Sequence, residues 1–272
     1  MDRRAEDSAG MTPAADLAAS EAGIPVEEAH QVTGDQTKLL EELTKRLRNV
    51  FGEGLVSAVL YGSGATGEMH GKFSDLNVLC VMKTITPLEL KRAEGVFHWW
   101  HSFDNPSPLL LTESEFRNGT DCFAIEFHDI VESHRVLAGE DVVKDLVIDD
   151  RFYRGQVEHE LRAKLLRLRQ KAGGMLSDKG ALLRLMTESV STFANLARHA
   201  LRLAGHAAPV QKREVIAACA VQFGIDPAPF YTLLDLRSGA ASARKTDPPV
   251  LLGDYMQQIE VLTEAVDRLA KG

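Results

Sequence analysis

Residues 60–79 read LYGSGATGEMHGKFSDLNVL, and this stretch decides how the rest of the chain is interpreted. The apolar run LVSAVLY leads into the pair Gly62-Ser63, and the apolar run LNVLCVM follows Asp75. Short apolar runs bounded by glycine and polar residues are typical of buried β-strands. We therefore expect two neighbouring strands, joined by a loop that starts at Gly62 and ends just before Asp75.

The spacing of polar residues in this stretch favours phosphate and metal chemistry. Gly62 allows a sharp turn and a close approach of the backbone to a ligand. The hydroxyl of Ser63 and the amides of the next turn are suited to donate to triphosphate oxygens, and Lys72 in the same loop is a candidate phosphate contact. Asp75 and Asn77 are two residues apart on a strand, so their side chains point to the same face.

The pattern around this stretch predicts an α/β domain. Residues 1–37 are rich in small and polar residues, and we expect a disordered or weakly ordered tail there. A helix is expected over 37–50 and another over 88–102, after Pro87. PLLLT at 108–112 predicts a third strand, SEFRNG a short helix or turn, and the alternating DCFAIEFHDI a fourth strand, after which ESHRVLAGED is expected to leave the sheet.

Helical periodicity dominates from about Phe152 to the end of the chain. Gly, Pro and Asp separate the helical segments, and no strand pattern appears after residue 150. We therefore divide the chain into a tail (1–37), an α/β domain with a mixed sheet (38–150) and an all-helical bundle domain (151–272).

These features together resemble the polymerase-β-like nucleotidyltransferase superfamily. The resemblance rests on a strand, Gly62-Ser63, a short loop, and Asp75 and Asn77 at the two positions where the superfamily has acids on the next strand, and it covers roughly residues 38–140. The strand-rich domain followed by helices is similar to the kanamycin and streptomycin nucleotidyltransferases. The resemblance implies transfer of a nucleoside monophosphate from an NTP to an acceptor hydroxyl. Gly62 and Ser63 would hold the triphosphate, and Mg²⁺ would be bound at Asp75 and at position 77.

The sequence departs from that pattern at Asn77, where the superfamily has a second acid. A neutral amide oxygen is a weaker ligand than a carboxylate for Mg²⁺, which prefers anionic oxygens in octahedral geometry. A third acid on a later strand would be Glu126 or Asp129, and Glu126 is preferred because Ile125 and Phe127 flank it. The alternative to the enzyme is an inactive protein of this fold that binds a nucleotide or a protein partner. The acceptor and the choice of NTP stay open.

The first long helix of the C-terminal half carries further candidates. Glu158 and His159 lie near its start as ligand or base candidates, although an acid there also stabilises the helix dipole. Several basic residues follow, and a solvated helix face is their ordinary explanation. These are Arg162, Lys164, Arg167, Arg169 and Lys171.

Bulk composition narrows the function classes. The chain has 272 residues and a net charge of -8, so its overall charge does not favour non-specific electrostatic binding to nucleic acid. Cys80, Cys122 and Cys219 form no CxxC pair, which disfavours a zinc ribbon; the first two lie in apolar runs and suggest core positions. We see no signal peptide and no membrane-spanning run, and we expect a cytoplasmic protein. Nothing in the sequence excludes a homo-oligomer.

Overall fold

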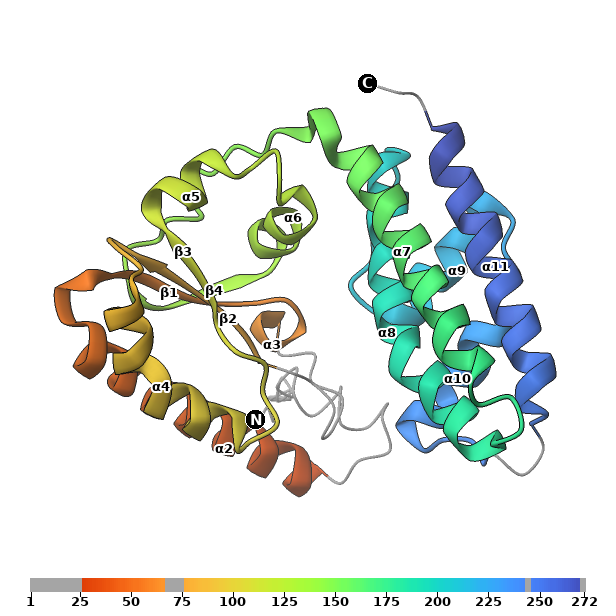
Figure 1. Ribbon diagram of the computed structural model, residues 1–272, viewed down its shortest axis with the longest axis horizontal. Helices are drawn as coiled ribbons and strands as arrows, with labels where there is room; N and C mark the ends of the chain where they lie inside the picture. Colours follow the sequence, from red (N-terminus) through yellow and green to blue (C-terminus); the bar gives the residue numbers. More distant parts are fainter. Residues whose placement is uncertain (1–25, 67–75, 243–245, 270–272) are drawn as a thin grey trace, which may run out of the picture. The chain divides into compact units, whose positions relative to one another are not determined.

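The computed structural model describes residues 26–66, 76–242 and 246–269, which form two compact units (Figure 1). The sheet unit comprises the described residues up to Phe116 together with Glu132–Lys144. The helical unit comprises Arg117–Val131 and the described residues from Asp145 onward. The chain therefore contributes one short segment, Arg117–Val131, to the helical unit before it returns to complete the sheet. From Asp145 onward it belongs to the helical unit.

The sheet unit holds a mixed sheet of four strands in the order β3-β2-β1-β4. Strand β1 (Leu55–Tyr61) pairs antiparallel with both β2 (Asn77–Met82) and β4 (His134–Gly139). Strand β2 pairs in parallel with β3 (Leu109–Thr112), and helix α4 (Pro87–His101) connects the two. The mixed sheet with helices confirms the expected fold class, and β1 and β2 are neighbours as expected.

Two helices cover one face of this sheet. Helix α2 (Val26–Phe51) and α4 lie side by side against it in Figure 1. Helix α4 begins with a capping box at Thr86, and Pro87 occupies its first turn without loss of a hydrogen bond. The buried side chains between the helices and the sheet form one core: Leu40, Leu43 and Leu47 from α2, Val96 and Trp100 from α4, and Ala58, Leu60, Val78 and Cys80 from the strands. The short elements of the unit are η1 (Gly52–Gly54), α3 (Ser63–Thr66) and α5 (Glu113–Asn118).

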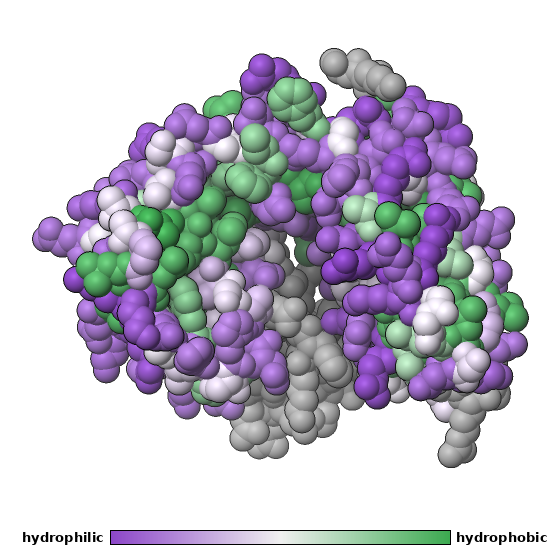
Figure 2. Space-filling model, in the orientation of Figure 1, coloured by the Kyte–Doolittle hydropathy of each residue, from purple (hydrophilic) through white to green (hydrophobic). Residues whose placement is uncertain are grey.

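Helices alone make up the regular structure of the helical unit within the described residues. They are α6 (Ala124–Glu132), η3 (Asp150–Phe152), α7 (Tyr153–Gly173), α8 (Lys179–Leu203), α9 (Lys212–Phe223), α10 (Ala228–Ser238) and α11 (Pro248–Arg268). Tyr255 lies at the centre of the core, with Phe193 and Phe230 packed edge-on at 5.8 and 5.1 Å. Hydrophilic side chains cover most of the face of this unit drawn in Figure 2.

The structure corrects several expectations. Residues 124–132 form helix α6 instead of a fourth strand, and the fourth strand is β4, in the segment expected to leave the sheet. Helix α2 begins at Val26, so residues 26–37 are helical, and residues 1–25 of the expected tail lie outside the described residues. The compact units group Arg117–Val131 with the helices, and the domain boundary near residue 150 stays a prediction. Cys80 is buried as expected, but Cys122 is exposed.

None of the described helices has the length and apolar character that a bilayer span requires.

Candidate functional site

Three residues form a row across the end of the sheet. Tyr61, the last residue of β1, pairs with Asn77 on β2 and with His134 on β4. The preceding row contains Leu60 and Val78, whose side chains lie in the core beneath α2 and α4. Successive side chains on a strand point to opposite faces, so Tyr61, Asn77 and His134 lie on the face of the sheet away from those helices.

A sharp turn at Gly62 adjoins this row. Gly62 has a φ of +73°, a left-handed conformation that a side chain would strain. Its amide donates to the carbonyl of Ser133 at 3.0 Å, and its own carbonyl accepts from the amide of Ala65 at 2.9 Å. A Cβ atom placed on Gly62 would lie 3.6 Å from Nδ2 of Asn77. The amide side chain of Asn77 therefore lies against the glycine turn, and the structure brings Gly62 and Asn77 together.

Asn105 holds the start of β2 in place, and the sequence interpretation missed it. Its side-chain oxygen accepts from the amide of Leu76 at 3.2 Å, and it is only 7% exposed. The indole of Trp100 donates to the carbonyl of Pro106 at 2.9 Å and fixes the same turn. An Asn-Pro pair marks a turn in a sequence, but its contact with a residue 29 positions away leaves no local pattern.

The described residues at this edge do not make a two-carboxylate Mg²⁺ site. None of the four strands contains Asp or Glu. Asn77 contributes one neutral oxygen, and within the described residues no group of three or more His, Cys, Asp or Glu side chains is arranged to hold a metal ion. Asp75 is the carboxylate that the sequence places beside this edge, and it lies outside the described residues, as does Lys72.

The preferred third acid, Glu126, is not on a strand. It lies in the first turn of α6, is exposed, and belongs to the helical unit. The expectation that Glu126 lies on a strand is therefore wrong, and its role as a third acid stays a prediction. Ser63, the other nucleotide-contact candidate, is the first residue of the short helix α3 directly after Gly62.

Asp129, the other acid considered for that role, is engaged within the helical unit. Its Oδ1 lies 2.5 Å from Nη2 of Arg198 and 3.1 Å from Nε2 of His199. The hydroxyl of Tyr153 hydrogen-bonds Nδ1 of His199 at 2.7 Å. Burial raises the pKa of Asp129, but the contacts with His199 and Arg198 outweigh burial and leave that pKa below its ordinary value. The charge of Asp129 is thus matched inside this unit.

The candidates on α7 are largely ion-paired. Glu158 lies between Arg162 and Arg154, each 2.8 Å away, and both contacts lower its pKa, with Arg162 contributing more. Lys164 pairs with Glu160, and Arg169 pairs with Glu260 of α11. His159, Arg167 and Lys171 are exposed. This geometry fits a solvated, salt-bridged helix face better than a catalytic base.

Comparisons with known proteins show the fold and nothing finer. No family model matches the sequence, and no curated protein matches it. Among solved structures, the chain is similar to spectinomycin adenyltransferase AAD(9) from Enterococcus faecialis, crystallised with ATP and spectinomycin, with a TM-score of 0.53 and 14% identity. The match covers 82% of this chain and 96% of the other, which is more of this chain than either compact unit contains. The chain thus has a nucleotidyltransferase fold combined with a helical domain.

Proposed function

We propose that the sheet unit binds a nucleoside triphosphate at the edge formed by Gly62, Ser63 and Asn77, and that it does so without a two-metal catalytic site. A left-handed glycine at the end of a buried strand supports the first part, because a residue without a side chain lets a phosphate approach the backbone closely. The fold supports it too, since the enzyme of similar structure was crystallised with ATP.

The single observation that carries the second part is the set of side chains at the end of the sheet. Asn77 lies against Gly62, and the described strands supply no carboxylate to this face. Two-metal transfer uses anionic ligands to bind both ions and to offset their charge. Asp75 alone would hold Mg²⁺ weakly, so the protein is proposed as a nucleotide-binding member of this fold with little or no transferase activity.

The second candidate is transfer of a nucleoside monophosphate to a hydroxyl of a small acceptor molecule. The similarity to spectinomycin adenyltransferase extends beyond either unit alone, which favours a shared two-part architecture. In that case Asp75 would be the main Mg²⁺ ligand and Asn77 a weak second one. Incubation with labelled ATP, GTP, CTP and UTP, Mg²⁺ and a cell extract tests it: a labelled product supports transfer, and its absence together with saturable nucleotide binding supports the binding protein.

Nucleotide binding itself is tested by titrating the full chain with ATP in EDTA and again in Mg²⁺. We expect saturable binding in both conditions, and we expect Ser63→Ala to weaken it about tenfold by removing a charge-assisted hydrogen bond to phosphate. Ser107→Ala removes an exposed hydroxyl near His101 and serves as the matched control. Absence of saturable ATP binding in either condition contradicts the proposal and favours a protein-partner module.

A further inference from the structure

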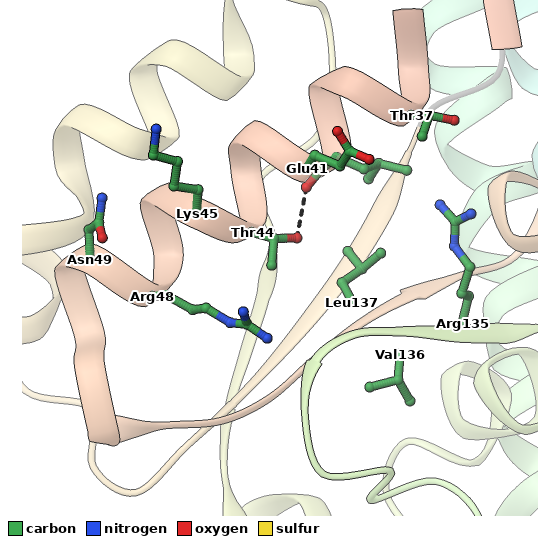
Figure 3. A pocket seen from close by; sticks show the side chains of 10 residues that line it. Thr37, Glu41, Thr44, Lys45, Arg48, Asn49, Arg135, Val136 and Leu137 are labelled. Atoms are coloured by element: carbon green, nitrogen blue, oxygen red, sulfur yellow. Dashed lines mark hydrogen bonds between the residues drawn. The ribbon is translucent and has the colours of Figure 1, made fainter. Parts of the chain in front are cut away.

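A groove of about 460 Å³ lies between helix α2 and the edge strand β4, within the sheet unit (Figure 3). Its volume is within the range of small-molecule sites. It lies on the α2 side of the sheet, whereas Asn77 belongs to the opposite face. The groove is therefore separate from the proposed nucleotide site, and nothing in that function accounts for it.

Three cations line the groove without a carboxylate partner among the residues that the structure describes. Lys45, Arg48 and Arg135 are exposed, and none of them forms an ion pair with another described residue. Arg46, on a different side of α2, behaves differently: it pairs with Glu42 at 2.7 Å and stacks on Trp99 at 4.3 Å. The chain has more acidic than basic residues, 39 against 31, so the local positive charge of the groove is opposite in sign to the net charge of the chain.

The two arginines approach the groove from different elements. Arg48 extends from the helix and Arg135 from the strand, and both side chains reach into the space between α2 and β4 (Figure 3). Leu137 lies between them, and Leu40 is buried at the base. The hydroxyl of Thr44 donates to the carbonyl of Leu40 at 2.7 Å, so its hydrogen is not available to a ligand. The groove thus combines two guanidinium groups with an apolar floor.

The charges of the lining match a dianion. Three cations and one carboxylate, Glu41, leave a net charge of +2 around the groove. Guanidinium groups bind phosphate oxygens in a bidentate manner, and they retain their charge at any physiological pH. A phosphate monoester carries nearly two negative charges at neutral pH, whereas a carboxylate carries one. Glu41 would accept a hydrogen bond from a donor on the organic part of the ligand.

We propose that this groove binds a small organic phosphate monoester. Arg48 from the helix and Arg135 from the strand supply the positive charge that attracts its phosphate, Lys45 adds long-range attraction, and the apolar body lies over Leu40 and Leu137. The ligand is held by the fixed charges of the sheet unit alone, and binding requires neither a metal ion nor the nucleotide edge.

Calorimetric titration of the full chain at low salt tests this with phenyl phosphate, which offers a phosphate dianion on an apolar body but no nucleoside. Benzoate and inorganic phosphate are the comparison probes, the first lacking the second charge and the second lacking the apolar body. We expect phenyl phosphate to bind most tightly. Arg48→Gln and Arg135→Gln should each weaken its binding by about tenfold, the usual scale of a charge-assisted contact.

Arg184→Gln, an exposed arginine on α8, is the matched control and should leave the affinity unchanged. Ser63→Ala should also leave it unchanged, which separates this site from the nucleotide edge. The proposal is overturned if phenyl phosphate does not bind saturably, if the Arg48→Gln/Arg135→Gln double variant binds it as well as the unaltered chain, or if Arg184→Gln or Ser63→Ala weakens it equally. Thermal melting of each variant checks that these exposed substitutions leave the fold intact.

Discussion

The end of the sheet at Asn77 and the cluster around Asp129 differ in how they use polar residues. The first has no carboxylate on its strands, lies against a strained glycine and is half-exposed. The second gathers Asp129, Arg198, His199 and Tyr153 in a well-buried network. The helical unit pairs Asp129 with Arg198 and His199, whereas the end of the sheet places Tyr61, Asn77 and His134 in one row on strands without Asp or Glu.

The largest expected effect comes from Asp129→Asn. This substitution removes the charge that faces Arg198 and His199 and leaves two cationic or polar groups under-compensated in a buried setting. Loss of one partner of a buried ion pair destabilises a protein by about 3 kcal/mol. We expect a loss of about that size, measured by urea denaturation of the helical unit.

Glu126→Gln is the matched control on the same helix. Glu126 is exposed and forms no ion pair with another described residue, so its substitution should change stability by no more than about 0.5 kcal/mol. Equal losses for the two variants would contradict the distinction between a buried structural acid and a solvated one.

Gly62→Ala tests the strained turn at the sheet edge. The left-handed φ of +73° should make this substitution cost about 1 kcal/mol. Gly95→Ala offers the opposite case, because Gly95 is exposed inside α4 and an added Cβ meets nothing within 4 Å. Alanine there should stabilise the protein by about 0.5–1 kcal/mol. Denaturation curves that shift in the same direction for both variants would argue against strain at Gly62.

A smaller effect is expected from the titration of His128. Burial lowers the pKa of His128, and the hydrogen bond to Asp150 at 2.7 Å opposes this only in part. Because the pKa of His128 is lower in the folded state, the unfolded chain takes up a proton at a higher pH than the folded chain does. The contribution of neutral His128 to the free energy of unfolding is therefore complete above the pKa of histidine in the unfolded chain, about 6.5. This contribution is lost as the pH falls through the lower pKa of the folded state. Stability should decline as the pH falls below about 6.5, and His128→Gln should flatten that decline in a pH series of urea melts.

The sequence predicts the parts of the fold whose periodicity is unambiguous. Strands β1 and β2, helix α4 and the helices after residue 152 follow directly from apolar runs and helical spacing. The errors concern α6 and β4. Phe123, Ile125 and Phe127 alternate as in a strand, but the buried side chains are Ala124, Phe127 and Ile130, which repeat every three residues.

The sequence pattern does not predict strand β4, because β4 lies at the edge of the sheet. His134 and Arg135 at its start make the segment polar, and it is only partly buried. Pairing with β1 fixes it as a strand, and such long-range pairing has no local signature. At the candidate site, the contacts of Asn105 with Leu76 and of Ser133 with Gly62 were equally inaccessible to local patterns. The placement of Gly62 beside Asn77 followed from strand pairing that the sequence does predict.

The most direct test of the central claim is the Mg²⁺ dependence of ATP binding in the unaltered chain and in Asn77→Asp. We expect the unaltered chain to bind ATP with nearly the same affinity in EDTA and in Mg²⁺. The added carboxylate should make binding Mg²⁺-dependent, with a gain of about 1–3 kcal/mol in Mg²⁺, the scale of one charge-assisted contact. Asn195→Asp, on an exposed position of α8, adds the same charge elsewhere and should create no such dependence. A strong Mg²⁺ dependence already present in the unaltered chain would contradict the account and favour the enzyme.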